Sequence, residues 1–223
     1  MSKTIITAVD ETDLDSFKKV IDSLDSDLCM LKIGSVSFNA FGHEAVFYAS
    51  KKGFDIFLDL KLHDIPNTVK KSIEGLKSLP IKMLTIHTSG GKQMMQYAME
   101  AVKGTNIKIF GVTALTSLSD DDTNQIYQRD ASSQVNAMLD LAEESGIDGV
   151  VCSPHELNLV SKRVGLLSIT PGIRLVNTDD DQSRVMTPKQ AIELGADYLV
   201  IGRPITASDD ISASLKEIYK SIQ

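Results

Sequence analysis

The stretch D-I-F-L-D-L-K-L-H-D-I-P-N-T-V, residues 55–69, contains one complete passage from a strand to a helix. Residues 55–60 form a short and almost continuously apolar run, which is the pattern of a strand covered on both faces. Pro66 marks the start of a helix, because its missing N–H costs nothing in the first helical turn. The stretch is therefore interpreted as one strand–helix unit of a parallel sheet, with charged residues gathered at the end of its strand.

The same unit recurs along the whole chain. Stretches with helical spacing separate the strands; residues 135–142 are one example, closed by Gly146, and Pro154 and Pro188 mark two further helix starts. At roughly 28 residues per unit, this α/β alternation favours a closed (β/α)8 TIM barrel over an open doubly wound sheet. We expect a single domain, residues 1–223. The predicted strands are residues 5–9, 28–33, 55–60, 83–86, 107–112, 149–152, 166–169 and 198–201.

Composition limits the possible partners. The 223 residues carry a net charge of −7 and 42% hydrophobic residues, which is typical of a globular protein and argues against a nucleic-acid partner. A small anionic substrate remains possible, because a few cations in a cleft set the local potential. Neither a signal peptide nor an apolar run of membrane-spanning length is apparent. Cys29 and Cys152 lie in apolar runs, so we expect core packing in a reducing, cytoplasmic location.

Polar groups and glycines stand at nearly every predicted strand end, which is where barrels of this kind place their chemistry. Asp59 and Lys61 are two residues apart, so on a regular strand they project to the same face, with Lys32 expected nearby. At an effective dielectric constant near 20, a charge contact at about 4 Å is worth on the order of 4 kcal/mol. An ion-pair network that only ties strands together is the competing interpretation. We assign no chemistry to His63 or His87.

The last two strand ends have the composition of a phosphate site. T-P-G-I-R, residues 170–174, and I-G-R-P-I, residues 201–205, follow the seventh and eighth strands, whose loops commonly bind phosphate in such barrels. Gly202 lets backbone N–H groups approach an anion, and Arg203 adds a permanently charged fork. The polar segment 175–184 between them is long enough to act as a lid, and Gln182 and Arg184 lie on its return path.

With these residues in view, the chain resembles the orotidine 5'-monophosphate decarboxylases, in their short monofunctional form. The segment D-L-K-L-H-D-I-P-N-T, residues 59–68, looks like the signature of that family. The shorter D-x-K-x-x-D pattern is shared by related phosphosugar enzymes, but the following residues and the two phosphate loops make the resemblance specific. It extends through residues 9–10, 31–34, 115–117, 170–174, 181–182 and 202–203.

The resemblance implies a reaction that needs no cofactor and no metal. Orotidine 5'-monophosphate would lose CO2 to give uridine 5'-monophosphate, a step of pyrimidine biosynthesis. Lys61 would stabilise and then protonate the carbanion, with Asp59 against the substrate carboxylate and Lys32 in the same charged array. Asp64 would complete the array in the site of a partner subunit, together with Thr68, so that a homodimer shares its active sites.

The remaining contacts implied by the resemblance bind the nucleotide. Asp10 and Lys32 would hold the ribose hydroxyls, Thr116 would contact the pyrimidine, and Gln182 would bridge the pyrimidine and the phosphate when the lid closes. Pro171 and Arg174 belong to the loop after the seventh strand that lines the pocket. Phosphate binding would fall to Gly202 and Arg203.

Two other functions remain open. A Mg²⁺-dependent decarboxylase or aldolase acting on a keto-sugar phosphate shares Asp59, Lys61 and Asp64, but it needs acidic metal ligands where this chain has Lys32, which repels a divalent cation. A non-catalytic nucleotide-binding barrel would keep the phosphate loops and could dispense with the charged array. Full activity after chelation excludes the first alternative, and turnover excludes the second.

Overall fold

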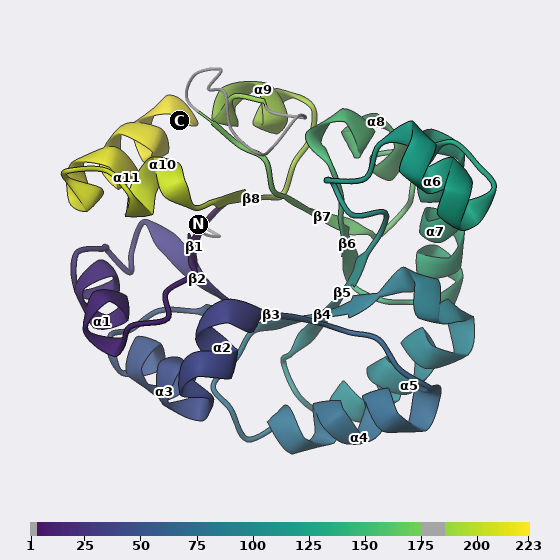
Figure 1. Ribbon diagram of the computed structural model, residues 1–223, viewed down its shortest axis with the longest axis horizontal. Helices are drawn as coiled ribbons and strands as arrows, with labels where there is room; N and C mark the ends of the chain where they lie inside the picture. Colours follow the sequence, from purple (N-terminus) through teal and green to yellow (C-terminus); the bar gives the residue numbers. More distant parts are fainter. Residues whose placement is uncertain (1–3, 175–185) are drawn as a thin grey trace.

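In the computed structural model, which describes residues 4–174 and 186–223, eight parallel strands close a barrel in the order β1 to β8 (Figure 1). Pairing of β1 with β8 closes the ring, with Ile5 opposite Leu199 and Thr7 opposite Ile201. The fold class predicted from the sequence is confirmed. The strands are β1 (Ile5–Val9), β2 (Cys29–Gly34), β3 (Ile56–Leu62), β4 (Met83–His87), β5 (Lys108–Val112), β6 (Gly149–Val151), β7 (Leu167–Thr170) and β8 (Tyr198–Ile201).

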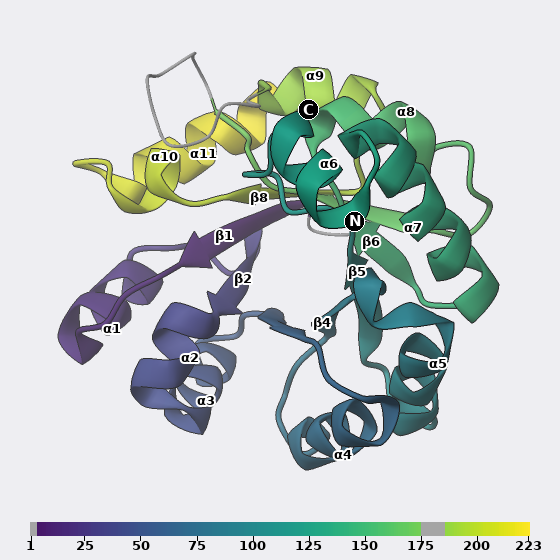
Figure 2. The ribbon, with the colours of Figure 1, turned by 45° about the vertical axis from the view of Figure 1, so that its right-hand side comes forward.

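The helices surround the strands, and the turned view keeps them outside the barrel (Figures 1 and 2). Between β1 and β5 lie α1 (Leu14–Asp22), α2 (Ser35–Phe41), α3 (His43–Lys51), α4 (Pro66–Leu76), the 3-10 turn η1 (Thr88–Gly90) and α5 (Gly91–Val102). The rest of the chain adds α6 (Asp120–Tyr127), α7 (Ala131–Ser145), the 3-10 turn η2 (Pro154–Glu156), α8 (Leu157–Val160), α9 (Pro188–Glu193), α10 (Arg203–Thr206) and α11 (Ile211–Ser221).

Local sequence explains where the helices begin and end. Pro66 and Pro188 occupy the first turns of α4 and α9, as the sequence predicts, whereas Pro154 begins a 3-10 turn rather than an α-helix. Gly146 ends α7 with φ 68°, a left-handed conformation that glycine adopts without steric cost. The Asp13 carboxylate accepts the Ser16 N–H at the start of α1.

Two apolar cores lie on opposite sides of the strands. The larger one packs the outer faces of the strands against the helices. Phe17 of α1 is one of its fully buried members. The inner one fills the barrel itself, where the Phe57 and Phe110 rings meet edge to face with centroids 6.4 Å apart. Its buried members are Ile6, Ala8, Met30, Phe57, Met83, Phe110, Ile169 and Val200. Apolar side chains therefore fill the barrel interior and form an apolar floor below the ends of the strands.

Both cysteines lie in the outer core, as the sequence predicts, and Cys29 and Cys152 are fully buried. Burial raises the pKa of the Cys152 thiol well above its usual value. Within residues 4–174 and 186–223, none of the helices combines the length and the apolar character needed to span a bilayer.

Candidate active site

A cavity of about 580 Å³ opens where the strands end at the mouth of the barrel. We call it the mouth cavity. The inner core contributes its floor through Ala8, Phe57, Val151 and Val200, and loop residues form its walls. Most of the binding and reaction residues expected from the sequence line this one space: Asp10, Lys32, Asp59, Lys61, Thr116, Pro171, Arg174, Gly202 and Arg203.

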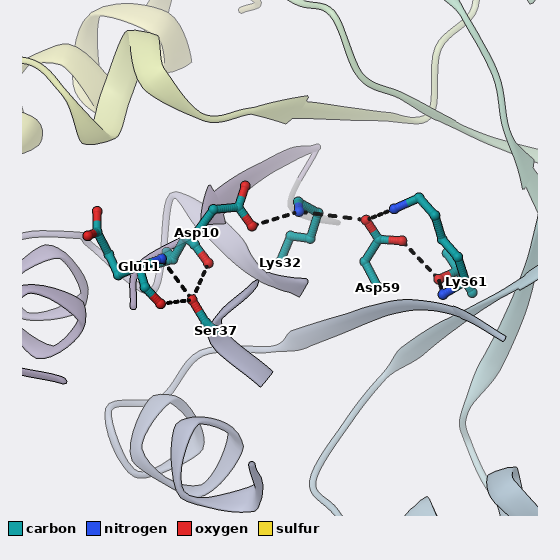
Figure 3. A network of polar contacts seen from close by, with 8 residues as sticks. Asp10, Glu11, Lys32, Ser37, Asp59 and Lys61 are labelled. Atoms are coloured by element: carbon teal, nitrogen blue, oxygen red, sulfur yellow. Dashed lines mark hydrogen bonds and ion pairs between the residues drawn. The ribbon is translucent and has the colours of Figure 1, made fainter. Parts of the chain in front are cut away.

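Four charged side chains of alternating sign form a row along one wall of the mouth cavity (Figure 3). The Lys61 ammonium lies 2.7 Å from Oδ2 of Asp59, and the Lys32 ammonium lies 3.6 Å from the same oxygen. Lys32 also lies 3.2 Å from Oδ1 of Asp10. We call this row, Asp10, Lys32, Asp59 and Lys61, the charged array. Its members come from neighbouring strand ends, so the barrel brings together residues that are distant in the sequence.

Asp59 is the centre of the charged array and is 6% exposed. Burial alone would raise the pKa of its carboxyl group, because a dry environment disfavours the charge. The positive charges of Lys32 and Lys61 and the hydrogen bonds from Lys61 and Thr85 outweigh burial, so that the pKa falls below its usual value. Asp59 is therefore ionised at neutral pH, and it holds two ammonium groups in place beside the cavity.

The backbone at Lys61 is not the regular strand assumed from the sequence. The pairing of β3 with β4 shifts register between Leu58 and Leu62, and Lys61 has φ 50°, which is uncommon for a residue with a side chain. Lys61 contacts Asp59 as predicted, but it does so from an irregular segment and not from a regular strand. Leu60 and Leu62 pack against the outer core, on the face opposite to the array.

Close packing around Lys32 leaves little room for a side chain at position 34. A Cβ atom added to Gly34 would lie 2.8 Å from the Lys32 ammonium and 3.1 Å from Oδ1 of Asp10. Any larger residue would displace the flexible end of Lys32 from its carboxylate partners. The absence of a side chain at Gly34 thus helps to preserve the geometry of the charged array, a role that the sequence does not indicate.

Arginines and glycines stand on the opposite wall. Pro171, Gly172 and Arg174 follow β7, and Gly202 and Arg203 follow β8. Arg174 is buried, and one of its guanidinium nitrogens donates a hydrogen bond to the Ile173 carbonyl at 3.1 Å. The cavity therefore has an acid–base wall made by the first strands and a wall with two guanidinium groups made by the last ones.

Three expected site residues are not placed in the mouth cavity. Asp64 and Thr68 are exposed and do not line it, and Oδ1 of Asp64 accepts the Ile65 N–H at 2.7 Å. Ile65, between them, is 67% exposed, although it is a large apolar residue. Gln182 lies outside the described residues, as does the rest of the expected lid, 175–184.

The sequence does not predict the role of Thr85 in the site, and it assigns no chemistry to His87. Thr85, on β4, donates its hydroxyl to Oδ1 of Asp59 at 2.9 Å, and nothing distinguished it from an ordinary strand threonine. His87 ends the same strand and packs against His63, with ring centroids 5.3 Å apart. Burial, followed by the nearby His63 and Lys61, lowers the pKa of His87, while Asp59 opposes the shift.

The lowered pKa of His87 gives a pH dependence of stability. Above about pH 6.5 the imidazole is neutral in both the folded and the unfolded chain. As the pH falls below that value, the unfolded chain binds a proton that the folded chain resists, so the free energy of unfolding decreases. His87→Gln should therefore lose less stability than the original protein between pH 7.5 and 5.5, measured by urea unfolding. His155→Gln, which replaces an exposed histidine, is the control. Equal losses in all three proteins would contradict the prediction.

Within the part of the chain that the structure describes, no group of three or more His, Cys, Asp or Glu side chains is arranged to hold a metal ion. At the end of β2, where a metal-dependent phosphosugar enzyme would need a carboxylate, the mouth cavity has Lys32, whose ammonium already contacts two carboxylates. Positive charge at this position opposes a divalent cation.

Comparisons with known proteins identify a family and a fold. A family model described as "Orotidine 5'-phosphate decarboxylase / HUMPS family" matches residues 3–218. Over 221 residues the chain is 44% identical to the orotidine 5'-phosphate decarboxylase of Wolbachia pipientis subsp. Culex pipiens, with 98% of each chain covered. It is 45% identical over 221 residues to that of Ehrlichia canis, covering 98% of this chain and 97% of the relative. The crystal structure of orotidine 5'-phosphate decarboxylase from Lactobacillus acidophilus superposes with a TM-score of 0.87 at 33% identity, and both chains are fully covered.

Proposed function

Because the chain belongs to the orotidine 5'-phosphate decarboxylase / HUMPS family, we propose that it converts orotidine 5'-monophosphate to uridine 5'-monophosphate and CO2. The observation that carries the proposal is the charged array, with Lys61 and Lys32 on one buried carboxylate, facing a cavity that also contains Arg174 and Arg203. One wall supplies fixed positive charge for a reaction, and the other supplies guanidinium groups for a phosphate.

The proposed chemistry follows from what the reaction requires. When the bond from C6 of the pyrimidine to the carboxylate breaks, its electron pair remains on C6, where the ring offers no adjacent electron sink. Stabilisation must come from charge that is already in place, and a preorganised ammonium group in a dry site provides it. Lys61 fills this role and then donates a proton to C6, after which solvent restores its own proton. Asp59 lies beside the departing carboxylate and holds Lys61 in position.

The opposite wall supports binding of the rest of the nucleotide. Arg203 and the Gly202 backbone bind the phosphate, with Arg174 and Pro171 lining the adjoining loop, while Asp10 and Lys32 bind the ribose hydroxyls and Thr116 the pyrimidine. Binding energy from the phosphate, remote from the reacting carbon, is available to hold the pyrimidine against the charged array. In this proposal Gln182 contacts pyrimidine and phosphate from the lid.

We also propose that the protein acts as a cytoplasmic homodimer with shared active sites. Asp64 and Thr68 do not line the mouth cavity of their own chain, and the apolar Ile65 between them is exposed. A second copy covering this segment would bury Ile65 and bring Asp64 to the partner's array. Two buried cysteines in the apolar core are in keeping with a reducing compartment.

The activity test uses protein dialysed exhaustively against a chelator. We expect a loss of the orotate ultraviolet absorbance when this protein meets orotidine 5'-monophosphate, at the same rate with and without added Mg²⁺, because the charged array replaces a metal. Activity only after Mg²⁺ is restored would favour the keto-sugar phosphate enzymes. Tight binding of uridine 5'-monophosphate by folded protein, without turnover of the orotate nucleotide, would favour a non-catalytic nucleotide-binding barrel.

A further inference from the structure

The inner face of β4 carries one buried hydroxyl that touches the charged array twice. Thr85 is fully buried. Its Oγ1 donates a hydrogen bond to Oδ1 of Asp59 at 2.9 Å and accepts one from the Lys61 N–H at 2.9 Å. A threonine hydroxyl has a single proton to donate, so its donor capacity is used entirely on Asp59.

The bond to Asp59 fixes how that carboxylate faces the two lysines. Oδ1 receives the Thr85 hydroxyl, while Oδ2 lies 2.7 Å from the Lys61 ammonium and 3.6 Å from the Lys32 ammonium. A carboxylate turns readily about its last side-chain bond, because that torsion has only broad minima. With one oxygen held on β4, the other stays directed at the ammonium groups (Figure 3).

The second bond holds the backbone of Lys61. The register shift between Leu58 and Leu62 interrupts the regular pairing of β3 with β4 at this point, and Lys61 has φ 50°. A residue other than glycine keeps such a backbone conformation only where the surrounding structure enforces it. The Thr85 oxygen gives the Lys61 N–H an acceptor across the gap, and in this way helps to maintain the conformation that aims the Lys61 side chain at Asp59.

We propose that Thr85 is a positioning residue, whose one hydroxyl sets both the carboxylate of Asp59 and the backbone of Lys61 for decarboxylation. The inference rests on the proposed function, since it assigns Thr85 to the reaction of that same site. Thr85 does not line the mouth cavity, so it acts through Asp59 and Lys61.

The test compares three variants. Thr85→Val keeps the shape and removes the hydroxyl, Thr85→Ser keeps the hydroxyl, and Thr7→Val is the matched control. Thr7 is an equally buried strand threonine on β1, and its hydroxyl has no hydrogen-bond partner within the described part of the chain. Thr85→Ala, which also lacks the hydroxyl and is smaller, replaces Thr85→Val if that variant does not fold.

Positioning predicts a specific pattern of kinetics. Thr85→Val should lower kcat by about 10- to 100-fold, because a small misplacement of a catalytic group is costly in rate. KM should change little, since the phosphate-side residues are untouched. Thr85→Ser should stay within about threefold of the original kcat, and so should Thr7→Val, because neither removes a hydrogen bond to the array. Equal losses in Thr85→Val and Thr85→Ser, or a Thr85→Val enzyme within about threefold of the original, would overturn the inference.

A second readout does not depend on turnover. The Thr85 hydrogen bond helps to lower the pKa of Asp59, so this pKa, followed by carbon NMR of the carboxyl group, should rise in Thr85→Val and stay low in Thr85→Ser. If the original protein shows no turnover, the proposed function fails while this measurement still decides whether Thr85 holds Asp59. An unchanged Asp59 pKa in Thr85→Val refutes the positioning role.

Discussion

Lys61→Ala is expected to abolish turnover while leaving the protein folded. The substitution removes both the proton donor and the positive charge that lies closest to the reacting carbon. General acid catalysis contributes about 10²- to 10⁴-fold and one preorganised charge a similar factor, so kcat should fall by at least about 10⁴-fold. The fold should persist, because Lys61 packs at the rim of the cavity and the apolar core below it is unchanged.

The measurement is single-turnover decay of the orotate absorbance, with circular dichroism and thermal unfolding to establish folding. Lys92→Ala is the control, because it removes an ammonium of another strand–helix unit, 3.0 Å from Glu144 on the surface of the barrel. That variant should retain full activity, since surface ion pairs contribute little to stability. A Lys61→Ala protein with substantial turnover would disprove the mechanism proposed for the charged array.

Asp64→Ala should also be inactive alone, by at least about 100-fold, yet it should regain activity when mixed with Lys61→Ala. If Asp64 completes the site of its partner, a hybrid dimer has one site that lacks both groups and one site that is intact. Random exchange of equal amounts makes half of the dimers hybrids, so activity should return to about one quarter of the original level. The exposed Asp64, which does not line the cavity of its own chain, motivates this experiment.

A matched mixture separates complementation from other effects of mixing. Asp59 and Lys61 lie 2.7 Å apart in the same chain, so hybrids of Asp59→Ala with Lys61→Ala have two defective sites and should stay inactive. Subunit exchange is followed independently with differently tagged chains. Asp64 would be assigned to its own chain's site, or to no site, if exchange is complete and the first mixture stays inactive.

Much of the fold could be predicted because its strands are buried on both faces. All five residues of β1 are buried, for example, and such runs stand out from the amphipathic helices around them. Strand ends were also predictable, since chemistry in this architecture gathers there. Asp10, Lys32, Asp59 and Lys61 could therefore be selected from the sequence, and the structure places them within one cavity.

The parts that could not be predicted depend on contacts between strands. Thr85 has the β-branched side chain expected of any strand, and only the distance to Asp59 distinguishes it. Lys61 was assumed to lie on a regular strand, because a register shift against β4 leaves no mark in the sequence of β3 alone. Nothing in the sequence of β2 distinguishes Gly34, whose importance comes from the Lys32 ammonium that would lie 2.8 Å from an added Cβ.

The pairing of β1 with β8 has a consequence for how the protein is made. Arg203 follows the last strand by two residues, so a nascent chain holds Asp10, Lys32, Asp59 and Lys61 long before it holds this arginine of the mouth cavity. Under the proposed function, a bound nucleotide contacts residues on both sides of the β1–β8 pairing and so links the first and last strands. Ligand at a hundred times its Kd would add about 2.7 kcal/mol against opening. A ligand bound in this way therefore stabilises the closed barrel against separation of its first and last strands.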